Sequence, residues 1–290
     1  MLITITYKIA KAAVRRIIWR LDRIFSVFNL SLIILDTENV HGLSFSRKSS
    51  NEEISTILHK FRPVLNGWPL VLVGGSRDGG YLLPTDLTNI GRCMSAGCDK
   101  NWSFEKSLYD SFAITSSILD SEDKRPPDLD ARHRYTPKWL GKRTTNNTIS
   151  FDDWVEKFSE AENSDLILQM DIEGFEWQAI TDIDEKLLER FRIMSIEFHG
   201  TQNLYNNRLL KKVYGPAIEK ILARFDVVHI HPNNCCGLQK FGSLEFPNVF
   251  EVTFHRKDRT NGILGYANLP NALDIKNVEA NPEIFITWST

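Results

Sequence analysis

The sequence predicts an α/β protein with a doubly wound, mostly parallel sheet. The first observation is the run Asp165–Trp177, DLILQMDIEGFEW, whose apolar residues show no strict alternation, as is typical of a strand buried on both faces. The second is that similar runs alternate with helical stretches, which implies right-handed crossovers. With 290 residues and 42% hydrophobic composition, the chain can also bury a large core.

Strand and helix candidates follow one another along most of the chain. The expected strands are Leu70–Val73, Arg92–Ala96, Phe112–Leu119, Asp165–Asp171, Ile193–Phe198, Asp226–His231 and Val249–His255. The expected helices are Glu52–Phe61, Ser103–Ser111, Phe151–Ala161, Asp184–Phe191 and Leu209–Phe225. The charged, proline-interrupted segment Ser121–Asp130 is predicted as an exposed loop.

The N-terminus differs in character from the rest of the chain. Helical spacing over Tyr7–Phe28 places apolar residues on one side and basic residues on the other, which predicts a basic amphipathic helix. The longest charge-free run, Ile24–Leu35, is too short to span a membrane, and the pattern is not that of a signal peptide. Either this helix contacts an anionic membrane surface, or it packs on the domain or on a second subunit.

A polar, serine-rich segment separates this helix from the expected sheet. We interpret Gly42–Glu53, GLSFSRKSSNEE, as a linker or exposed loop. This places the domain boundary at residue 50, with a helical extension and linker over residues 1–50 and the α/β domain over residues 51–290.

Composition argues against several classes of protein. The net charge of -2 and the pI near 6.4 give no support for nucleic acid as a partner, because phosphate-tracking surfaces need a basic excess. Four cysteines are too few and too irregularly spaced for a disulfide scaffold. We therefore expect a cytoplasmic protein, peripheral at the inner face of a membrane if the helix binds lipid. The adjacent Cys235 and Cys236 are expected to be buried or half-buried thiols, with a reactive pair as the alternative.

Polar residues gather where the predicted strands end. Asp171 and Glu173 follow a buried strand, at the edge where open α/β sheets keep their ligand crevice, or they only cap the next helix. The segment Ser95–Glu105, SAGCDKNWSFE, combines a turn at Gly97 with a helix start and could present free N–H groups to a ligand. It lacks the three glycines of a dinucleotide fingerprint. Asp120 ends the next strand, where a carboxylate could accept hydrogen bonds from a ribose.

Several sequence blocks together resemble the FkbM-type methyltransferase domain family. The resemblance extends from about Leu70 to Lys257 and includes SIEFHG, VHIHPNN and PNVFEVTF besides four longer blocks: Arg77–Pro84, RDGGYLLP; Ser95–Glu105; Thr148–Trp154, TISFDDW; and Asp171–Trp177, DIEGFEW. The resemblance implies a class I methyltransferase fold with a seven-stranded sheet. It also implies S-adenosylmethionine as the cofactor and methyl transfer, usually to an oxygen.

The resemblance also implies roles for individual residues. Asp171, Glu173 and Gly174 match the block beside the active site. The chain departs from many members at Asp99 and Asn101, and a side chain at position 99 could crowd the methionine end of the cofactor. The positions that match cofactor-site blocks are Asp78, Gly79, Gly80, Tyr81, Gly97, Ser103, Phe104, Glu105 and Asp120.

Two mechanisms remain open for proton removal from a hydroxyl acceptor. In the first, His199 is the general base, oriented by Glu173 or Glu197, and Asp171 and Glu173 complete the catalytic group. In the second, Asp171, Glu197 and His231 hold Mg²⁺ or another divalent cation that acidifies the hydroxyl. His229 and His231 share one side of their strand, and a pair bonded to backbone is the structural alternative.

The sequence therefore predicts an S-adenosylmethionine-dependent methyltransferase. The expected reaction is O-methylation of a hydroxyl on a sugar, glycan or related metabolite, with a small molecule or glycan as acceptor. One alternative is a metal-dependent hydrolase using the same strand-end acids and histidines. The other is a non-catalytic, membrane-recruited module that depends on the basic helix.

Overall fold

The computed structural model describes residues 21, 29–37, 40–76, 78–159 and 164–288. The amphipathic helix predicted over Tyr7–Phe28 lies outside these residues apart from Leu21, so that helix stays a prediction. Across the described residues, no helix combines the length and the apolar character needed to cross a membrane.

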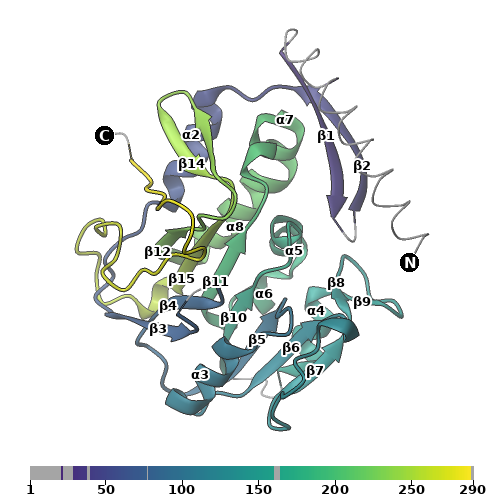
Figure 1. Ribbon diagram of the computed structural model, residues 1–290, viewed down its shortest axis with the longest axis vertical. Coiled ribbons are helices and arrows are strands. Elements are labelled where there is room, and N and C mark those ends of the chain that lie inside the picture. The colour runs from purple at the N-terminus through teal and green to yellow at the C-terminus, as the bar shows by residue number, and fades with distance from the viewer. Residues whose placement is uncertain (1–20, 22–28, 38–39, 77, 160–163, 289–290) are drawn as a thin grey trace.

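A seven-stranded sheet forms the centre of the molecule (Figure 1). All neighbouring strands run parallel except β15, which is antiparallel to both of its neighbours. The doubly wound, mostly parallel sheet of class I methyltransferase type is therefore confirmed. In spatial order the strands are β12 (Phe225–Pro232), β15 (Phe250–Arg256), β11 (Phe191–Phe198), β10 (Asp165–Met170), β5 (Ile90–Ala96), β6 (Ser116–Asp120) and β7 (Arg134–Pro137).

The strand order creates a crevice between β5 and β10. From β5 the chain adds β6 and β7 on one side, then returns to build β10 and β11 on the other side. In open α/β sheets the ligand binds at such a reversal, outside the carboxyl ends of the strands. Residues 97–101 and 171–175 follow β5 and β10 directly, so both loops lie at this crevice.

Each face of the sheet is covered by a different set of elements. Helices α4 (Phe151–Phe158), α5 (Glu176–Asp182) and α8 (Gly215–Arg224) pack over the larger hydrophobic cluster. Helix α3 (Ser103–Phe112) covers the smaller cluster on the other face (Figure 1). Leu168 points into the first cluster and Ile167 into the second. Strand β10 is thus buried on both faces, as its unalternating apolar run predicts.

The segment predicted to begin the main sheet forms a separate hairpin. Strand β3 (Leu70–Gly74) pairs antiparallel with β4 (Gly80–Pro84) in a two-stranded sheet. Gly74 and Gly79 adopt positive φ angles of 102° and 84°, which glycine tolerates without strain and which close the turn. The hairpin lies against α3 and joins the smaller cluster through Val73, Tyr81 and Leu83.

The segment predicted as a linker is partly a strand. Strand β1 (Leu30–Thr37) pairs antiparallel with β2 (Val40–Arg47), so the expectation of an exposed loop is wrong for residues 42–47. Pairing with β1 satisfies the backbone of this polar segment. Ser50 then begins α2 (Asn51–Leu58) with a capping box to Glu53. The proposed domain boundary at residue 50 stays a prediction.

Several predicted elements have shifted ends. Helix α3 runs to Phe112 and ends where Ala113 adopts the left-handed conformation, so the strand predicted from Phe112 begins at Ser116. The helix predicted over Asp184–Phe191 is only the single turn α6 (Glu185–Leu188), because Phe191 already belongs to β11. Helix α5 follows the turn at Gly174, where the sequence predicted a helix without fixing its bounds.

The long helix predicted over Leu209–Phe225 is divided. It consists of α7 (Asn207–Leu209), a π-helical turn at Leu210–Tyr214, and α8. Pro216 lacks the N–H that would continue the regular helical hydrogen bonds, which accounts for the irregular turn before it. The remaining short strands, also unpredicted, are β8 (Trp139–Leu140), β9 (Thr148–Ile149), β13 (Leu238–Phe241) and β14 (Leu244–Pro247).

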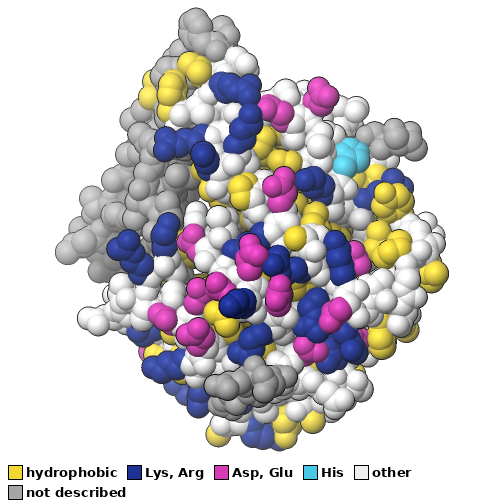
Figure 2. All heavy atoms as spheres, turned by 180° about the vertical axis from the view of Figure 1, so that it is seen from behind, with side chains coloured by type: hydrophobic (Ala, Val, Ile, Leu, Met, Phe, Trp, Pro, Cys, Tyr) yellow, Lys and Arg dark blue, Asp and Glu magenta, His cyan; other side chains and the backbone are white. Residues whose placement is uncertain are grey.

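Figure 2 shows the side of the molecule opposite to Figure 1, with acidic and basic side chains interspersed over its described part. Binding along a nucleic-acid backbone requires an excess of basic groups on one surface. This face presents no continuous basic patch, in line with the near-neutral composition.

A buried ion network lies at the opposite end of the sheet from the crevice. Asp86, whose side chain is 1% exposed, contacts Arg192 at 3.2 Å and Arg259 at 2.7 Å. His255 Nε2 lies 3.2 Å from the same carboxylate. Burial alone would raise the pKa of Asp86, but these cationic partners hold the pKa below its usual value.

We expect Asp86→Asn to lower the free energy of unfolding by about 3 to 5 kcal/mol, because the buried network, in which Arg192 then keeps only Asp165, loses the negative charge that faces Arg192 and Arg259. Urea denaturation measures this loss. The matched control is Asp110→Asn, which removes an exposed ion pair with Lys106 and should cost less than about 1 kcal/mol. Equal losses in the two variants would contradict a special role of the buried network.

Candidate functional site

A cavity of about 270 Å³ opens at the carboxyl ends of β5, β6 and β10. Its volume is near the lower end of the range for ligand pockets, roughly 300 to 1,000 Å³. Gly80 lies outside the lining of this cavity. The predicted site residues that line it are Asp78, Gly79, Tyr81, Gly97, Ser103, Phe104, Glu105, Asp120, Asp171 and Glu173.

Gly97 is where the two loops of the crevice touch. It has a φ of +83°, and a Cβ at this position would lie 1.6 Å from the backbone oxygen of Asp171. The Asp171 N–H also donates to the Ala96 carbonyl at 2.9 Å. No side chain fits between these two backbones, so the prediction that Gly97 makes the turn has a steric basis.

Asp120 supports the same loop from the end of β6. Its Oδ2 accepts hydrogen bonds from the backbone N–H groups of Cys98 at 2.9 Å and Asp99 at 3.1 Å. Its Oδ1 accepts from the Ser121 N–H at 2.7 Å. A carboxylate can accept about four hydrogen bonds. Asp120 therefore holds the loop in place, and its oxygens can accept few further hydrogen bonds from a ligand.

The two departures from the family pattern do not fill the cavity. Asp99 has a positive φ of 38°, a conformation that favours glycine. Its side chain is 76% exposed and pairs with Lys124, so it is directed largely toward solvent. Asn101 accepts a hydrogen bond from the Ser103 N–H at 3.1 Å and so supports the start of α3.

A buried polar group lies on the α3 side of the cavity. The Ser95 hydroxyl contacts both Glu105 and Gln169, and Gln169 donates to the Tyr81 hydroxyl at 3.3 Å. Burial raises the pKa of Glu105, which favours its neutral form. Since Ser95 has only one hydroxyl hydrogen, a neutral Glu105 can supply the proton for the second contact.

Sequence reasoning missed a residue that organises the turn after β10. The buried Glu176 accepts hydrogen bonds from the N–H groups of Ile172 and Gly174, both at 3.0 Å, through one oxygen. The same oxygen lies 3.1 Å from His199 Nδ1. Glu173 is held at a φ of +57°, which is uncommon for a residue with a Cβ. The acid at the start of a helix, three residues after Glu173, is the signal that could have identified Glu176.

His199 lies among carboxylates. Its Nε2 is 3.9 Å from Asp171, 3.8 Å from Glu173 and 3.6 Å from Glu197. Burial alone would lower the pKa of His199, but the hydrogen bond to Glu176 and the surrounding negative charges raise the pKa to about 10. The structure thus brings Asp171, Glu173 and His199 together, and it favours a charged imidazole at neutral pH.

Asp171 is the carboxylate that faces the cavity from the end of β10. Burial raises the pKa of Asp171, an effect that the nearby His199 partly offsets. Its Oδ1 is buried and has no hydrogen-bond partner among the described residues. An oxygen in this state can accept a hydrogen bond from a ligand, and a raised pKa makes it a better proton acceptor.

The three predicted metal ligands do not converge. Asp171, Glu197 and His231 end three different strands, but β15 lies between β11 and β12, which separates Glu197 from His231 by two strand spacings, about 10 Å. His231 Nδ1 instead lies 3.4 Å from Glu251. In the described part of the chain, ligand atoms come within 4.8 Å of one another in two groups, Asp171–Glu173–His199 and Asp78–Glu197–Glu251.

His229 and His231 point to the same side of β12, as predicted, with their rings 6.4 Å apart. Their partners are carboxylates rather than the backbone. His229 Nε2 is 2.8 Å from Asp274, in the segment that follows β15.

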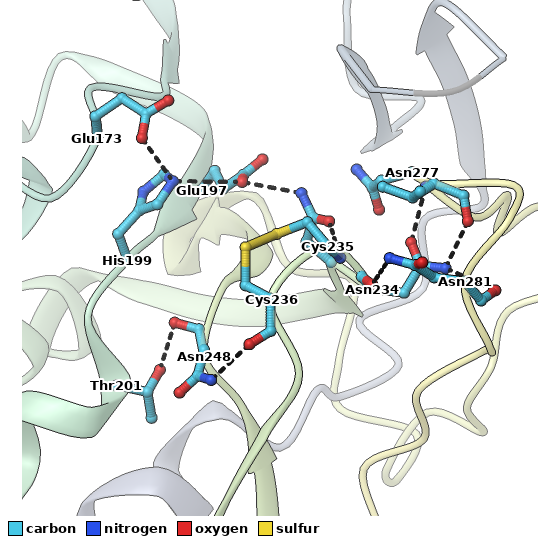
Figure 3. Close-up of a disulfide and its surroundings, with 12 residues drawn as sticks. Glu173, Glu197, His199, Thr201, Asn234, Cys235, Cys236, Asn248, Asn277 and Asn281 are labelled. Atoms are coloured by element: carbon cyan, nitrogen blue, oxygen red, sulfur yellow. Dashed lines mark hydrogen bonds and ion pairs between the residues drawn. A yellow bond between two sulfur atoms is a disulfide. The ribbon is translucent and has the colours of Figure 1, made fainter.

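A disulfide lies beside His199 and its neighbouring acid Glu197 (Figure 3). Cys235 and Cys236 are bonded to each other in an exposed loop after β12, so the expectation of buried or half-buried thiols is wrong. The loop is held by Asn233, which accepts from the Cys235 N–H at 2.9 Å and donates to Glu197 at 3.1 Å. Cys93 and Cys98 are free and buried.

Comparison with known proteins identifies the class. Residues 95–226 match the family model described as "Methyltransferase FkbM domain". The match covers less than half of the chain, and the matched part includes Gly97, Asp120, Asp171 and His199. No curated protein matches the chain.

Solved structures with some similarity to this chain include the following three proteins. Fibrillarin, a pre-rRNA processing protein of Methanococcus jannaschii, has 9% identity and a TM-score of 0.35, covering 79% of this chain and 94% of its own. A 16S rRNA (adenine(1408)-N(1))-methyltransferase from Catenulisporales acidiphilia has 7% identity and a TM-score of 0.30, covering 64% and 98%. Methyltransferase CalO6 has 10% identity and a TM-score of 0.30, covering 58% of each chain.

We expect Glu176→Gln to lower the pKa of His199 from about 10, because the charge that most favours the imidazolium is removed. An NMR titration of the His199 ring measures the change. The matched control is Glu156→Gln, at an exposed position on α4, and it should leave the pKa of His199 unchanged. An unaltered pKa in Glu176→Gln would contradict this assignment.

The raised pKa of His199 also predicts how the stability of the protein depends on pH. Because the pKa of folded His199 lies above the ordinary value of 6.5, its contribution to stability is complete below pH 6.5 and is lost as pH rises through about 10. Urea unfolding of the wild type should therefore become easier over this window, and Glu176→Gln should show a smaller change. Parallel curves for the two proteins would contradict the link to Glu176.

Proposed function

We propose that this protein is an S-adenosylmethionine-dependent O-methyltransferase that acts on a hydroxyl of a sugar, glycan or related metabolite. The observation that carries the proposal is the continuity of two features in one crevice. The cavity between β5 and β10, where Gly97 makes the turn, leads directly to the Asp171–Glu173–His199 group. A cofactor pocket and a proton-accepting group thus meet at the edge where α/β sheets bind ligands.

The residues of the cavity fit the cofactor that the family implies. The close approach of Gly97 to Asp171 forms one wall of the cavity, and both residues line it. Asp120 and Glu105 line the cavity from β6 and α3. Trp139, which sequence reasoning left unassigned, adds an aromatic surface from β8, suited to a flat ring. When bound, S-adenosylmethionine supplies a reactive methyl group on a sulfonium.

The charges of the site favour Asp171 over His199 as the proton acceptor. A protonated imidazole has no free lone pair, and the neighbouring carboxylates favour that state for His199. Asp171 has a buried oxygen without a partner among the described residues, and its pKa is raised. Asp171 would take the proton of the acceptor hydroxyl, while His199, held by Glu176, would keep the carboxylates in place.

The chemistry of the surrounding groups supports a hydroxyl-bearing acceptor. Carboxylates and amides dominate this end of the crevice, including Glu173, Glu197 and Asn233. Ionised carboxylates only accept hydrogen bonds, so they pair well with the several O–H donors of a sugar. The same groups would repel a phosphate or carboxylate.

The family match favours methyl transfer over the two alternatives. A metal-dependent hydrolase needs the strand-end acids but no cofactor cavity, and a non-catalytic module needs neither. Membrane contact through residues 7–28 is a separate proposal that would bring the enzyme to lipid-linked acceptors, supported by the basic amphipathic pattern of that segment. It is tested by salt-sensitive binding to anionic liposomes.

Calorimetry with S-adenosylhomocysteine tests the cofactor site. We expect the wild type to bind and Asp120→Ala to bind more weakly by roughly 1.5 to 3 kcal/mol, about tenfold to 150-fold, because charge-assisted hydrogen bonds to the loop are lost. Asp123→Ala, which removes an exposed acid of the following turn, is the control and should bind as the wild type does. Absence of binding by the wild type would refute the proposed function.

Asp171→Asn tests the proton acceptor. It should reduce methyl transfer from labelled S-adenosylmethionine to sugar acceptors by roughly 100-fold or more, with S-adenosylhomocysteine binding retained. A panel of neutral sugars and glycans identifies the acceptor first. Full turnover by Asp171→Asn would remove this residue from the mechanism.

A further inference from the structure

A second group of acids lies next to the proposed acceptor site. Asp78, Glu197 and Glu251 each place a ligand oxygen within 4.8 Å of the others. Asp78 precedes β4, Glu197 lies near the end of β11, and Glu251 faces Glu197 across the β11–β15 pair. The three residues thus come from three elements that only the fold brings together.

Two of these acids are removed from water. The side chains of Glu197 and Glu251 are each 5% exposed. Glu197 Oε1 accepts from Asn233, but its Oε2 is buried and has no hydrogen-bond partner within the described part of the chain. His231 faces Glu251 at 3.4 Å and His199 faces Glu197 at 3.6 Å, so two imidazoles balance part of the negative charge, while Glu197 Oε2 still lacks a partner among the described residues.

An independent observation comes from Asn277, in the segment after β15. Its side chain is 9% exposed and donates from Nδ2 to Glu251 Oε1 at 2.7 Å. Its Oδ1 is buried without a hydrogen-bond partner among the described residues. In Figure 3 the end of the Asn277 side chain is directed toward the side of the site where Glu197 lies. An amide oxygen in that state indicates a missing cation or donor.

The Asn277 segment is fixed in place by the loop after β12. Asn234 accepts from the Val278 N–H at 2.8 Å and donates to the Val278 carbonyl at 2.8 Å. Asn281 donates to the Asn234 carbonyl at 2.9 Å (Figure 3). These contacts all lie C-terminal to residue 277, and they hold its segment so that Asn277 Nδ2 stays 2.7 Å from Glu251 Oε1.

We propose that Asp78, Glu197, Glu251 and the Asn277 amide oxygen bind one hard divalent cation of the Mg²⁺ or Mn²⁺ type. Carboxylate and amide oxygens are the ligands such ions prefer. This site replaces the predicted set of Asp171, Glu197 and His231, of which it retains only Glu197. Glu197 also lies 3.6 Å from His199. If the proposed function holds, the cation therefore adjoins the acceptor hydroxyl and would lower its pKa.

Mn²⁺ binding to the purified full-length protein, followed by electron paramagnetic resonance, tests the site. We expect one bound Mn²⁺ per chain, displaced by excess Mg²⁺. Glu251→Gln should weaken binding by roughly tenfold to 100-fold. The control is Glu245→Gln, at a half-exposed acid on β14 paired with Lys240, which should bind as the wild type does. Asn277→Leu, which leaves the three acids intact, should also weaken binding.

Three results would overturn the proposal. The first is no Mn²⁺ binding by the wild type at pH 8, which would mean that the acids are balanced without a cation. The second is unchanged binding in both Glu251→Gln and Asn277→Leu. The third is binding lost in Asp171→Asn but kept in Glu251→Gln, which would move the ion to the Asp171–Glu173–His199 group. If S-adenosylhomocysteine binds and Mn²⁺ does not, only the cation site is refuted. If Mn²⁺ binds and S-adenosylhomocysteine does not, only the proposed function is refuted.

Discussion

The close backbone contact between Gly97 and Asp171 is the constraint on which the site depends. Strands β5 and β10 are neighbours in the sheet, and their end loops meet where a Cβ at position 97 would lie 1.6 Å from a carbonyl oxygen. The contact fixes the cavity wall and the direction of the turn that carries Asp171 and Glu173. Asp120 supports the same loop from the adjacent β6 through backbone N–H groups. The loop after β5 and the turn after β10 are therefore one structural unit.

Electrostatics divides the crevice into two regions. On the cavity side, neutral and amide-bearing groups such as Gln169 and Tyr81 surround Glu105, and burial favours the protonated form of this acid. On the acceptor side, carboxylates from β10, β11 and the turn after β10 surround His199. The buried Glu176 organises the acceptor side, because one of its oxygens holds both the turn after β10 and the imidazole of His199.

The sheet and much of the cofactor region could be predicted from sequence because their signals are local. The unalternating run of β10 indicates a strand buried on both faces, and Gly97 indicates a turn that no other residue fits. Less was predictable where short-range pairing leaves no hydrophobic period in the sequence. The hairpin of β3 and β4, the pairing of residues 42–47 with β1 and the disulfide between Cys235 and Cys236 depend on contacts that periodicity does not encode.

The sequence alone determined that acids and histidines end neighbouring strands of a parallel sheet, since each strand and its terminal residues are continuous in the chain. Tertiary structure decided which of them meet. Insertion of the antiparallel β15 between β11 and β12 separates His231 from Glu197 and places Glu251 between them. Docking of the later segment then brings Asn277 to Glu251. Strand order and docking are set by packing over the whole sheet, so no local pattern in the sequence specifies them.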